Sequence, residues 1–138
     1  MPVNFSGKWK VKSADDNVDV VMAKEGYSAE VIKYMKTSLS FETRHNGEEF
    51  THVYTDPDGK AVVVEGKIGT KEVQKDNLGR EVASITNWEG DKLVTEGAYV
   101  DAPMSKIRIV RELKGNLMLN STTLMDSGVT AETIFEKC

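Results

Sequence analysis

Hydrophobic residues recur at every second position in several short segments of the chain, and a period of two is typical of half-buried β-strands. Three segments show the pattern most clearly: Leu39, Phe41 and Thr43; Phe50, His52 and Tyr54; Ile107, Ile109, Arg111 and Leu113. Glycines in turn-like surroundings separate such segments at intervals of 10 to 12 residues between Gly47 and Gly90. The pattern predicts an antiparallel meander that closes into a barrel or folds as a sandwich.

Residues 16–37 break this alternation. Their apolar side chains recur at helical spacing in two groups: Val18, Val21 and Met22, then Ile32 and Met35. Gly26 separates the groups, and Ser28 has the residue type that caps a helix N-terminus. We therefore predict one strand, a hairpin of two short helices, and then strands to the end of a single domain, residues 1–138.

Composition narrows the classes of protein that fit. A chain of 138 residues can bury a core without metal or disulfide support, and Cys138 is its only cysteine, so a disulfide within the chain is impossible and Cys138 can at most join two copies. A net charge of −4 disfavours a nucleic-acid partner. The first ten residues carry charges, and no run of 18 apolar residues occurs, which favours a cytoplasmic monomer.

Arg111 departs from the alternation of its own segment, because it shares the apolar face with Ile107, Ile109 and Leu113. A guanidinium does not lose its charge in proteins, and burying it without an anion or several acceptors is unfavourable. An internal salt bridge or a water cluster would satisfy an inward Arg111. A ligand carboxylate would satisfy it equally, because the planar fork of N–H donors matches two carboxylate oxygens.

Other candidate chemistry is sparse. His45 and His52 are the only histidines, and neither has the Cys, Asp or Glu spacing of a zinc or iron site. No nucleophile elbow, glycine-rich phosphate loop or HExxH motif occurs, so we expect neither an enzyme nor a bound metal or cofactor.

Several strings, taken together with the order of strand, helical hairpin and strands, carry a resemblance over nearly the whole chain: NFSGKWK at 4–10, GKIG at 66–69, GREV at 79–82, WEGDKL at 88–93, VREL at 110–113 and IFEK at 134–137. The chain resembles the intracellular lipid-binding proteins, which include the fatty-acid-binding and cellular retinoid-binding proteins. The resemblance implies an all-β fold, a flattened, ten-stranded, up-and-down antiparallel barrel with a helix-turn-helix lid between its first two strands. One lipid would occupy the cavity, and the protein would carry it.

In many proteins of this family two arginines and a tyrosine hold the ligand's carboxylate. By resemblance the first arginine falls on Arg111, whereas Thr133 stands at the second arginine and Phe135 at the tyrosine. Strand alternation and resemblance together predict these ligand-binding residues: Phe41, His52, Tyr54, Ile109, Arg111, Thr133 and Phe135 on the strands, and Val18, Met22 and Ile32 on the lid. The predicted ligand is a long-chain fatty acid or a similar hydrophobic carboxylate.

Two further departures concern the loops and the lid. The stretch from Gly97 to Ser105 is longer than usual and is expected to form an enlarged loop between two strands. The turn at Lys114 and Gly115 is one residue short by alignment, so the sequence leaves open which residues of the next strand face Arg111. Val18 stands where the family usually has an aromatic residue.

Other readings compete with a fatty-acid carrier. The same fold could carry a retinoid, a bile acid or another amphiphile, and a secreted lipocalin shares a Gly-x-Trp motif near its start. A small β-barrel could also bind haem or catalyse an isomerisation through His45 or His52. The lid could make transient membrane contact through Lys24, Lys33 and Lys36.

Overall fold

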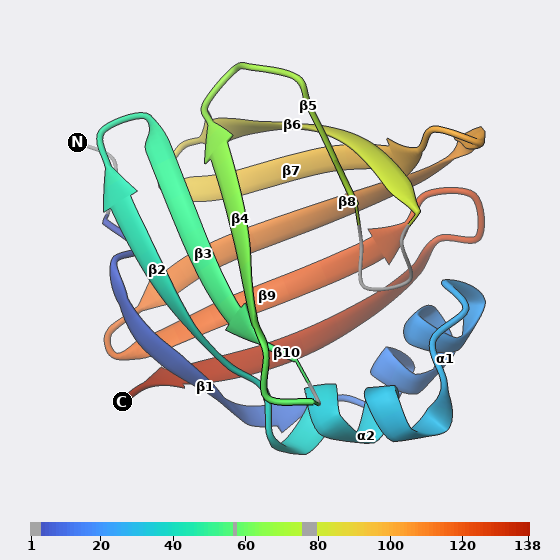
Figure 1. Cartoon of the computed structure of the whole chain (residues 1–138), viewed down its shortest axis with the longest axis horizontal. Helices are drawn as coiled ribbons and strands as arrows, with labels where there is room; N and C mark the ends of the chain where they lie inside the picture. Colours follow the sequence, from blue (N-terminus) through green and yellow to red (C-terminus); the bar gives the residue numbers. More distant parts are fainter. Residues whose placement is uncertain (1–3, 57, 76–79) are drawn as a thin grey trace.

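The computed structural model describes residues 4–56, 58–75 and 80–138, with the backbone alone for residues 102–105. Within these residues the chain forms ten β-strands and two α-helices, as predicted (Figure 1). The helices are α1 (Asn17–Lys24) and α2 (Ala29–Thr37), and the strands are β1 (Gly7–Ala14), β2 (Ser40–Asn46), β3 (Glu49–Thr55), β4 (Ala61–Lys67), β5 (Glu72–Lys75), β6 (Glu81–Glu89), β7 (Lys92–Tyr99), β8 (Ala102–Lys114), β9 (Leu117–Leu124) and β10 (Val129–Lys137). Pro57 and Gly79, which the sequence places in turns, lie outside the described residues.

The strands form one antiparallel sheet that curves into a barrel, in the order β4-β3-β2-β1-β10-β9-β8-β7-β6-β5. Consecutive strands are neighbours with the exception of β4 and β5, and β1 pairs with β10, so β4 and β5 are the two edges. The Gln74 side-chain amide of β5 donates to the Glu65 carbonyl of β4 across this seam. The turn between them is tied to β6, because the Gly69 N–H donates to the Thr86 carbonyl at 2.9 Å.

The strand register turns the alternating residues of the sequence toward the barrel interior. Phe41 of β2 stands opposite Tyr54 of β3, and the same two strands pair Thr43 with His52. On β8, Arg111 stands opposite Asn120 of β9. This register answers the question that the short turn at residues 114–115 leaves open: Asn120, with Met118 two residues before it, is on the Arg111 face.

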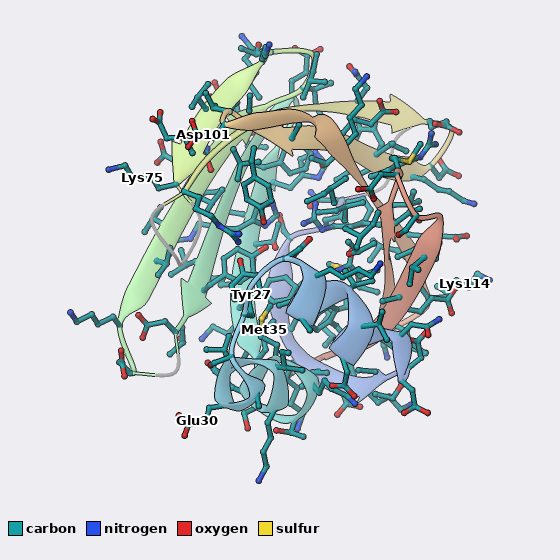
Figure 2. The ribbon with its side chains drawn as sticks, turned by 90° about the vertical axis from the view of Figure 1, so that its right-hand side faces the viewer. Tyr27, Glu30, Met35, Lys75, Asp101 and Lys114 are labelled. Carbon is teal, nitrogen blue, oxygen red and sulfur yellow. The ribbon has the colours of Figure 1, made fainter. Side chains whose placement is uncertain are left out.

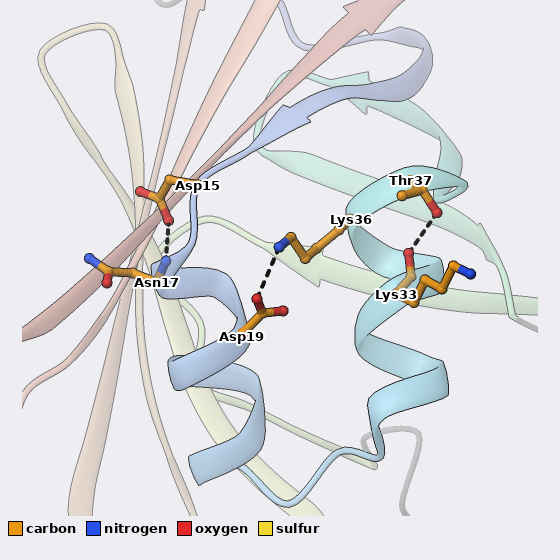
Figure 3. A network of polar contacts seen from close by, with 6 residues as sticks. All are labelled: Asp15, Asn17, Asp19, Lys33, Lys36 and Thr37. Carbon is orange, nitrogen blue, oxygen red and sulfur yellow. Dashed lines mark hydrogen bonds and ion pairs between the residues drawn. The ribbon is translucent and has the colours of Figure 1, made fainter.

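The helix pair lies across one end of the barrel, as Figure 1 shows. Ser28 caps α2 as predicted, since its Oγ accepts from the Val31 N–H at 3.3 Å. Lys36 of α2 and Asp19 of α1 form an ion pair of 3.0 Å that joins the two helices (Figure 3). Within the described residues, neither helix is long and apolar enough to cross a membrane.

The expectation of an enlarged loop between Gly97 and Ser105 is wrong. The turn between β7 and β8 holds only Val100 and Asp101, and the strands extend to either side of it. Ala98 pairs with Lys106, whereas Tyr99 pairs with Ala102, so three residues of β8 have no partner on β7. A bulge of this kind absorbs extra residues within a strand, where it increases the local bend and twist.

A cluster of large apolar side chains begins at the end of the barrel away from the lid, near the N-terminus, and continues inward to Phe41 and Phe135. Its buried members are these: Phe5, Trp9, Phe41, Phe50, Leu93, Met118 and Phe135. The Trp9 indole donates to the Phe5 carbonyl at 3.1 Å, which satisfies its polar atom inside the cluster. The N-terminal segment therefore closes this end of the barrel.

Leu93 provides a test of this closed end, because its side chain is 2% exposed. Leu93→Ala is expected to lower the free energy of unfolding by about 2–5 kcal/mol through lost burial and the cavity that it leaves. Val73→Ala, at an outward side chain that is 54% exposed, should change stability by less than about 0.5 kcal/mol. Urea denaturation of both variants measures the difference, and equal effects would contradict the assignment of Leu93 to the core.

Candidate functional site

The barrel contains two cavities that meet at three shared lining residues, Tyr54, Val64 and Arg111. We call the one beneath the helices the lid-side cavity, with a volume of about 300 Å³. The other, which we call the inner cavity, has a volume of about 120 Å³. Arg111 therefore stands at the junction between two compartments.

The lid-side cavity is walled mainly by apolar and aromatic side chains. The lid contributes Met22, Tyr27, Val31, Tyr34 and Met35, and the strands contribute among others Leu39, Phe41, Val62, Ile109 and Phe135. Figure 2 views this end of the molecule and shows Tyr27 and Met35 between the helices and the strands, whereas Glu30 points outward. Such a wall suits the hydrocarbon part of an amphiphile, because apolar groups gain free energy when they leave water.

The inner cavity has a more polar wall. Beside Arg111 and His52 it is lined by polar side chains, by the half-buried carboxylate of Glu72 and by two exposed charged residues: Glu65, Lys67, Thr70, Glu72, Gln74, Ser84, Thr86 and Thr95. Thr86 and Thr95 hydrogen-bond to each other at 2.8 Å across β6 and β7. A compartment of this size and polarity can hold a ligand's polar head or a few water molecules.

Arg111 projects into both cavities, and its side chain is half-buried. In the described part of the chain no hydrogen bond or ion pair involves its guanidinium. The internal salt bridge that the sequence left open is therefore not formed with any described residue. Because Arg111 lines both cavities, its N–H donors are available to a group that enters either of them.

His52 lies in the inner cavity, where its Nδ1 is 2.9 Å from the Oγ1 of the buried Thr43. Burial lowers the pKa of His52 to about 3, and the positive charge of Arg111 and the nearby His45 add to this effect. A low pKa keeps the imidazole neutral at physiological pH. The junction between the cavities therefore holds the permanent positive charge of Arg111, with the neutral imidazole of His52 in the inner cavity beside it.

His45 belongs to the closed end of the barrel instead. Its Nδ1 accepts from the Phe5 N–H at 3.2 Å, and its Nε2 lies 2.7 Å from the Gly47 carbonyl oxygen. Both ring nitrogens are thus engaged by the backbone. In the described ranges, no group of three or more His, Cys, Asp or Glu is placed to hold a metal ion.

Seven of the ten predicted ligand-binding residues line these cavities: Met22, Phe41, His52, Tyr54, Ile109, Arg111 and Phe135. The other three are placed elsewhere. Val18 is buried against Leu124 and Ala131 beneath α1, and Ile32 is buried on α2, but neither lines a cavity. Thr133 stands opposite Asn120 in the sheet and also lies outside the lining.

Sequence reasoning missed several lining residues. Asn120 and Thr122 of β9 were missed because the length of the turn before β9 left open which residues of that strand face the barrel interior. Tyr27 and Tyr34 were missed because the apolar spacing of the lid gave no weight to tyrosines. The polar wall of the inner cavity carried no signal, since threonines and serines on a strand usually face solvent.

In addition to the packing of α1 on the sheet, two lid tyrosines contact residues outside the lid. The Tyr34 hydroxyl donates to the Thr55 carbonyl at the end of β3, and burial together with the Asp56 carboxylate raises the pKa of Tyr34. On the other side, the Arg80 guanidinium carbon lies 4.2 Å from the ring centre of Tyr99 and 5.8 Å from that of Tyr27. The lid is therefore fixed to both edges of the opening over the lid-side cavity.

Comparison of the sequence with known proteins finds a relative among the binding proteins for retinoids. The cellular retinoic acid-binding protein 1 of Hippocampus comes is 28% identical over 120 residues, which are 84% of this chain and 86% of that protein. No family model matches the chain.

Comparison with solved structures finds the same fold. A Schistosoma mansoni fatty acid binding protein, solved in complex with arachidonic acid, matches with a TM-score of 0.80 and 26% identity over 97% of this chain and 96% of that one. The fatty-acid-binding protein 1 of Echinococcus granulosus gives 0.78 and 19% over 96% of both chains, and a mutant of the fluorescent protein UnaG gives 0.80 and 22% over 97% and 96%. The predicted fold and the predicted resemblance are both confirmed.

The low pKa of His52 predicts how stability depends on pH. Between its folded-state pKa of about 3 and its unfolded value of 6.5, the unfolded chain binds the extra proton, so acidification favours unfolding. From pH 7 to pH 4.5 the wild type should lose about 2–3 kcal/mol through His52 alone. His52→Gln lacks this loss, so its stability should fall less over the same range in denaturant titrations. Parallel curves for the two proteins would refute the prediction.

Proposed function

We propose that this chain, which has the fold and the sequence likeness of an intracellular lipid-binding protein, carries one long-chain fatty acid or similar hydrophobic carboxylate in its barrel. The observation that carries the proposal is Arg111, an unpaired guanidinium at the junction of an apolar and a polar cavity. A carboxylate on a hydrocarbon chain complements both features at once. The solved neighbour in complex with arachidonic acid supports this ligand class.

The two cavities support a definite orientation of the ligand. The carboxylate would pair with Arg111, and the hydrocarbon tail would occupy the lid-side cavity between Met35, Phe41 and Phe135. Each methylene that leaves water contributes roughly 0.8 kcal/mol, so the tail supplies most of the affinity and the head sets the direction. Residual polar atoms of the head would face the inner cavity, whose hydroxyls and waters can satisfy them.

A retinoid is the second candidate, because the curated relative is named for retinoic acid. Three aromatic rings support a flat conjugated ligand. Phe41 lies 5.1 Å from Tyr54 and 5.0 Å from Phe135 between ring centres, and all three line the lid-side cavity. Retinoic acid also ends in a carboxylate, so it would pair with Arg111 in the same way.

The proposed carrier role also concerns the oligomeric state of the protein, its location in the cell and its contact with membranes. The retinoic acid-binding relative and the two fatty-acid-binding neighbours are named for binding rather than for a reaction. We propose a monomeric cytoplasmic carrier whose helical lid makes transient contact with membranes. Lys24 and Lys33 are exposed on the lid, whereas Lys36 is paired with Asp19.

Native mass spectrometry of the freshly purified protein tests the ligand class directly. The proposal is supported if the protein carries a mass increment and the molecule extracted into organic solvent is a fatty acid or retinoic acid. An uncharged lipid would shift Arg111 toward a structural role. A protein that is empty and then takes up neither oleate nor retinoic acid in titration would overturn the carrier function.

Arg111→Leu tests the anion anchor. Oleate affinity should fall roughly 10- to 100-fold, because a charge-assisted hydrogen-bonded pair is lost. Affinity for oleyl alcohol, which has the same tail, should change by less than about threefold. Displacement of a neutral fluorescent dye from the delipidated protein measures the affinities for both ligands. Arg111→Lys serves as the charge control, and equal losses of both ligands in Arg111→Leu would refute the anchor.

A further inference from the structure

We propose that Asn120 is the positioning residue of the anion site: its side-chain oxygen Oδ1 accepts one N–H of Arg111 and so turns the guanidinium toward the ligand's carboxylate. This inference rests on the proposed function, because it assigns a role in that same site. Neither the alternation of the sequence nor the resemblance to the lipid-binding family identified Asn120.

The first observation is an acceptor without a donor. Asn120 lines the lid-side cavity, yet its Oδ1 is buried and has no hydrogen-bond partner among the residues that the structure describes. A buried carbonyl oxygen without a hydrogen bond is unfavourable and is rare in native structures. It is the only buried side-chain atom of the described residues in this condition. We therefore expect a donor at Asn120, from a side chain, a ligand or a water molecule.

The second observation is that the strand register places such a donor beside it. Arg111 of β8 stands directly opposite Asn120, and both line the lid-side cavity. Side chains directly opposite in an antiparallel pair have Cβ atoms about 4.5–5.5 Å apart, within reach of a long side chain. A change of Arg111 side-chain torsions therefore suffices to bring an N–H to Oδ1.

The donor count of arginine makes the two contacts compatible. A guanidinium has five N–H groups in a rigid plane, and a bidentate carboxylate uses two of them. Without a second acceptor, the long Arg111 side chain samples several torsion angles. Binding of the carboxylate then loses the conformational entropy of that side chain, which lowers the affinity. With Asn120 holding one edge of the plane, the opposite edge keeps its direction toward the ligand.

Thr133 is the other neighbour of Asn120, because it stands opposite on β10. Its hydroxyl has a single donor, and Thr133 does not line either cavity. The three side chains thus form one row across β10, β9 and β8, with the amide between a hydroxyl and the guanidinium. A role for Thr133 as the donor predicts effects that do not depend on Arg111, which separates the two arrangements by experiment.

The test is a double-mutant cycle on the delipidated full chain, with oleate and oleyl alcohol as the probes. Asn120→Leu should weaken oleate binding about 5- to 10-fold and leave oleyl alcohol within about twofold. In the Arg111→Leu background the same substitution should change oleate affinity by less than about twofold, because the group on which it acts is gone. Denaturant titration of each variant checks that the barrel remains folded.

Two further variants sharpen the result. Ser121→Ala alters the neighbouring residue of β9, which lines neither cavity, and should leave oleate affinity within about twofold. Asn120→Asp places a carboxylate against Arg111 and should weaken oleate more than Asn120→Leu does, while it spares the alcohol. Because Asn120→Asp nearly preserves side-chain size, it keeps the proposal testable if Asn120→Leu does not fold.

The outcomes separate this inference from the proposed function. Loss of both ligands alike in Asn120→Leu, or the same oleate loss in the Arg111→Leu background, would overturn the positioning role and leave the anion anchor intact. An equal loss caused by Ser121→Ala would do the same. If Arg111→Leu itself does not distinguish oleate from oleyl alcohol, then the anchor and the positioning role are both wrong.

Discussion

A permanent positive charge inside a barrel of apolar side chains is the constraint around which this site is built. Arginine cannot discard its proton, so the barrel has to provide polar surroundings, solvent or an anion at that point. The structure meets the requirement in an asymmetric way: mainly polar side chains, with the neutral imidazole of His52 among them, lie on one side of Arg111, and mainly apolar and aromatic side chains lie on the other. The asymmetry makes the interior directional, which is the property that a carrier of amphiphiles needs.

The neutrality of His52 follows from the same constraint. A second cation beside Arg111 would raise the cost of the buried charge, and burial together with that charge holds the imidazole in its uncharged form. Thr43, which is buried on the neighbouring strand, gives the ring a hydrogen-bond partner without adding charge. The polar wall thus offers hydrogen bonds, while Arg111 alone offers a positive charge at the junction.

The sequence predicted the strands well because one face of each is buried, and the alternation around Phe41, His52 and Arg111 records that burial directly. It predicted the helical lid from apolar spacing, but it could not tell which lid residues meet the cavity and which meet the sheet, and Val18 proved to pack on the sheet. Asn120 was not predicted as a cavity residue, because a one-residue difference in the length of a turn exchanges the inward and outward residues of the next strand. The extra residues before Lys106 were taken for a loop, since a bulge within a strand has no local sequence signal here.

The seam between β4 and β5 has a consequence for encounters between copies of the molecule. Each edge strand presents backbone N–H and carbonyl groups that a strand from a second copy can pair with, as in edge-to-edge aggregation. The edge at β5 is only four residues long and is bordered by the exposed Lys71 and Lys75. The Gln74 amide already occupies the Glu65 carbonyl on the opposite edge. Short length, like charges and a side chain that covers the backbone oppose growth of the sheet beyond one chain, so the barrel can stay open along one side without polymerising.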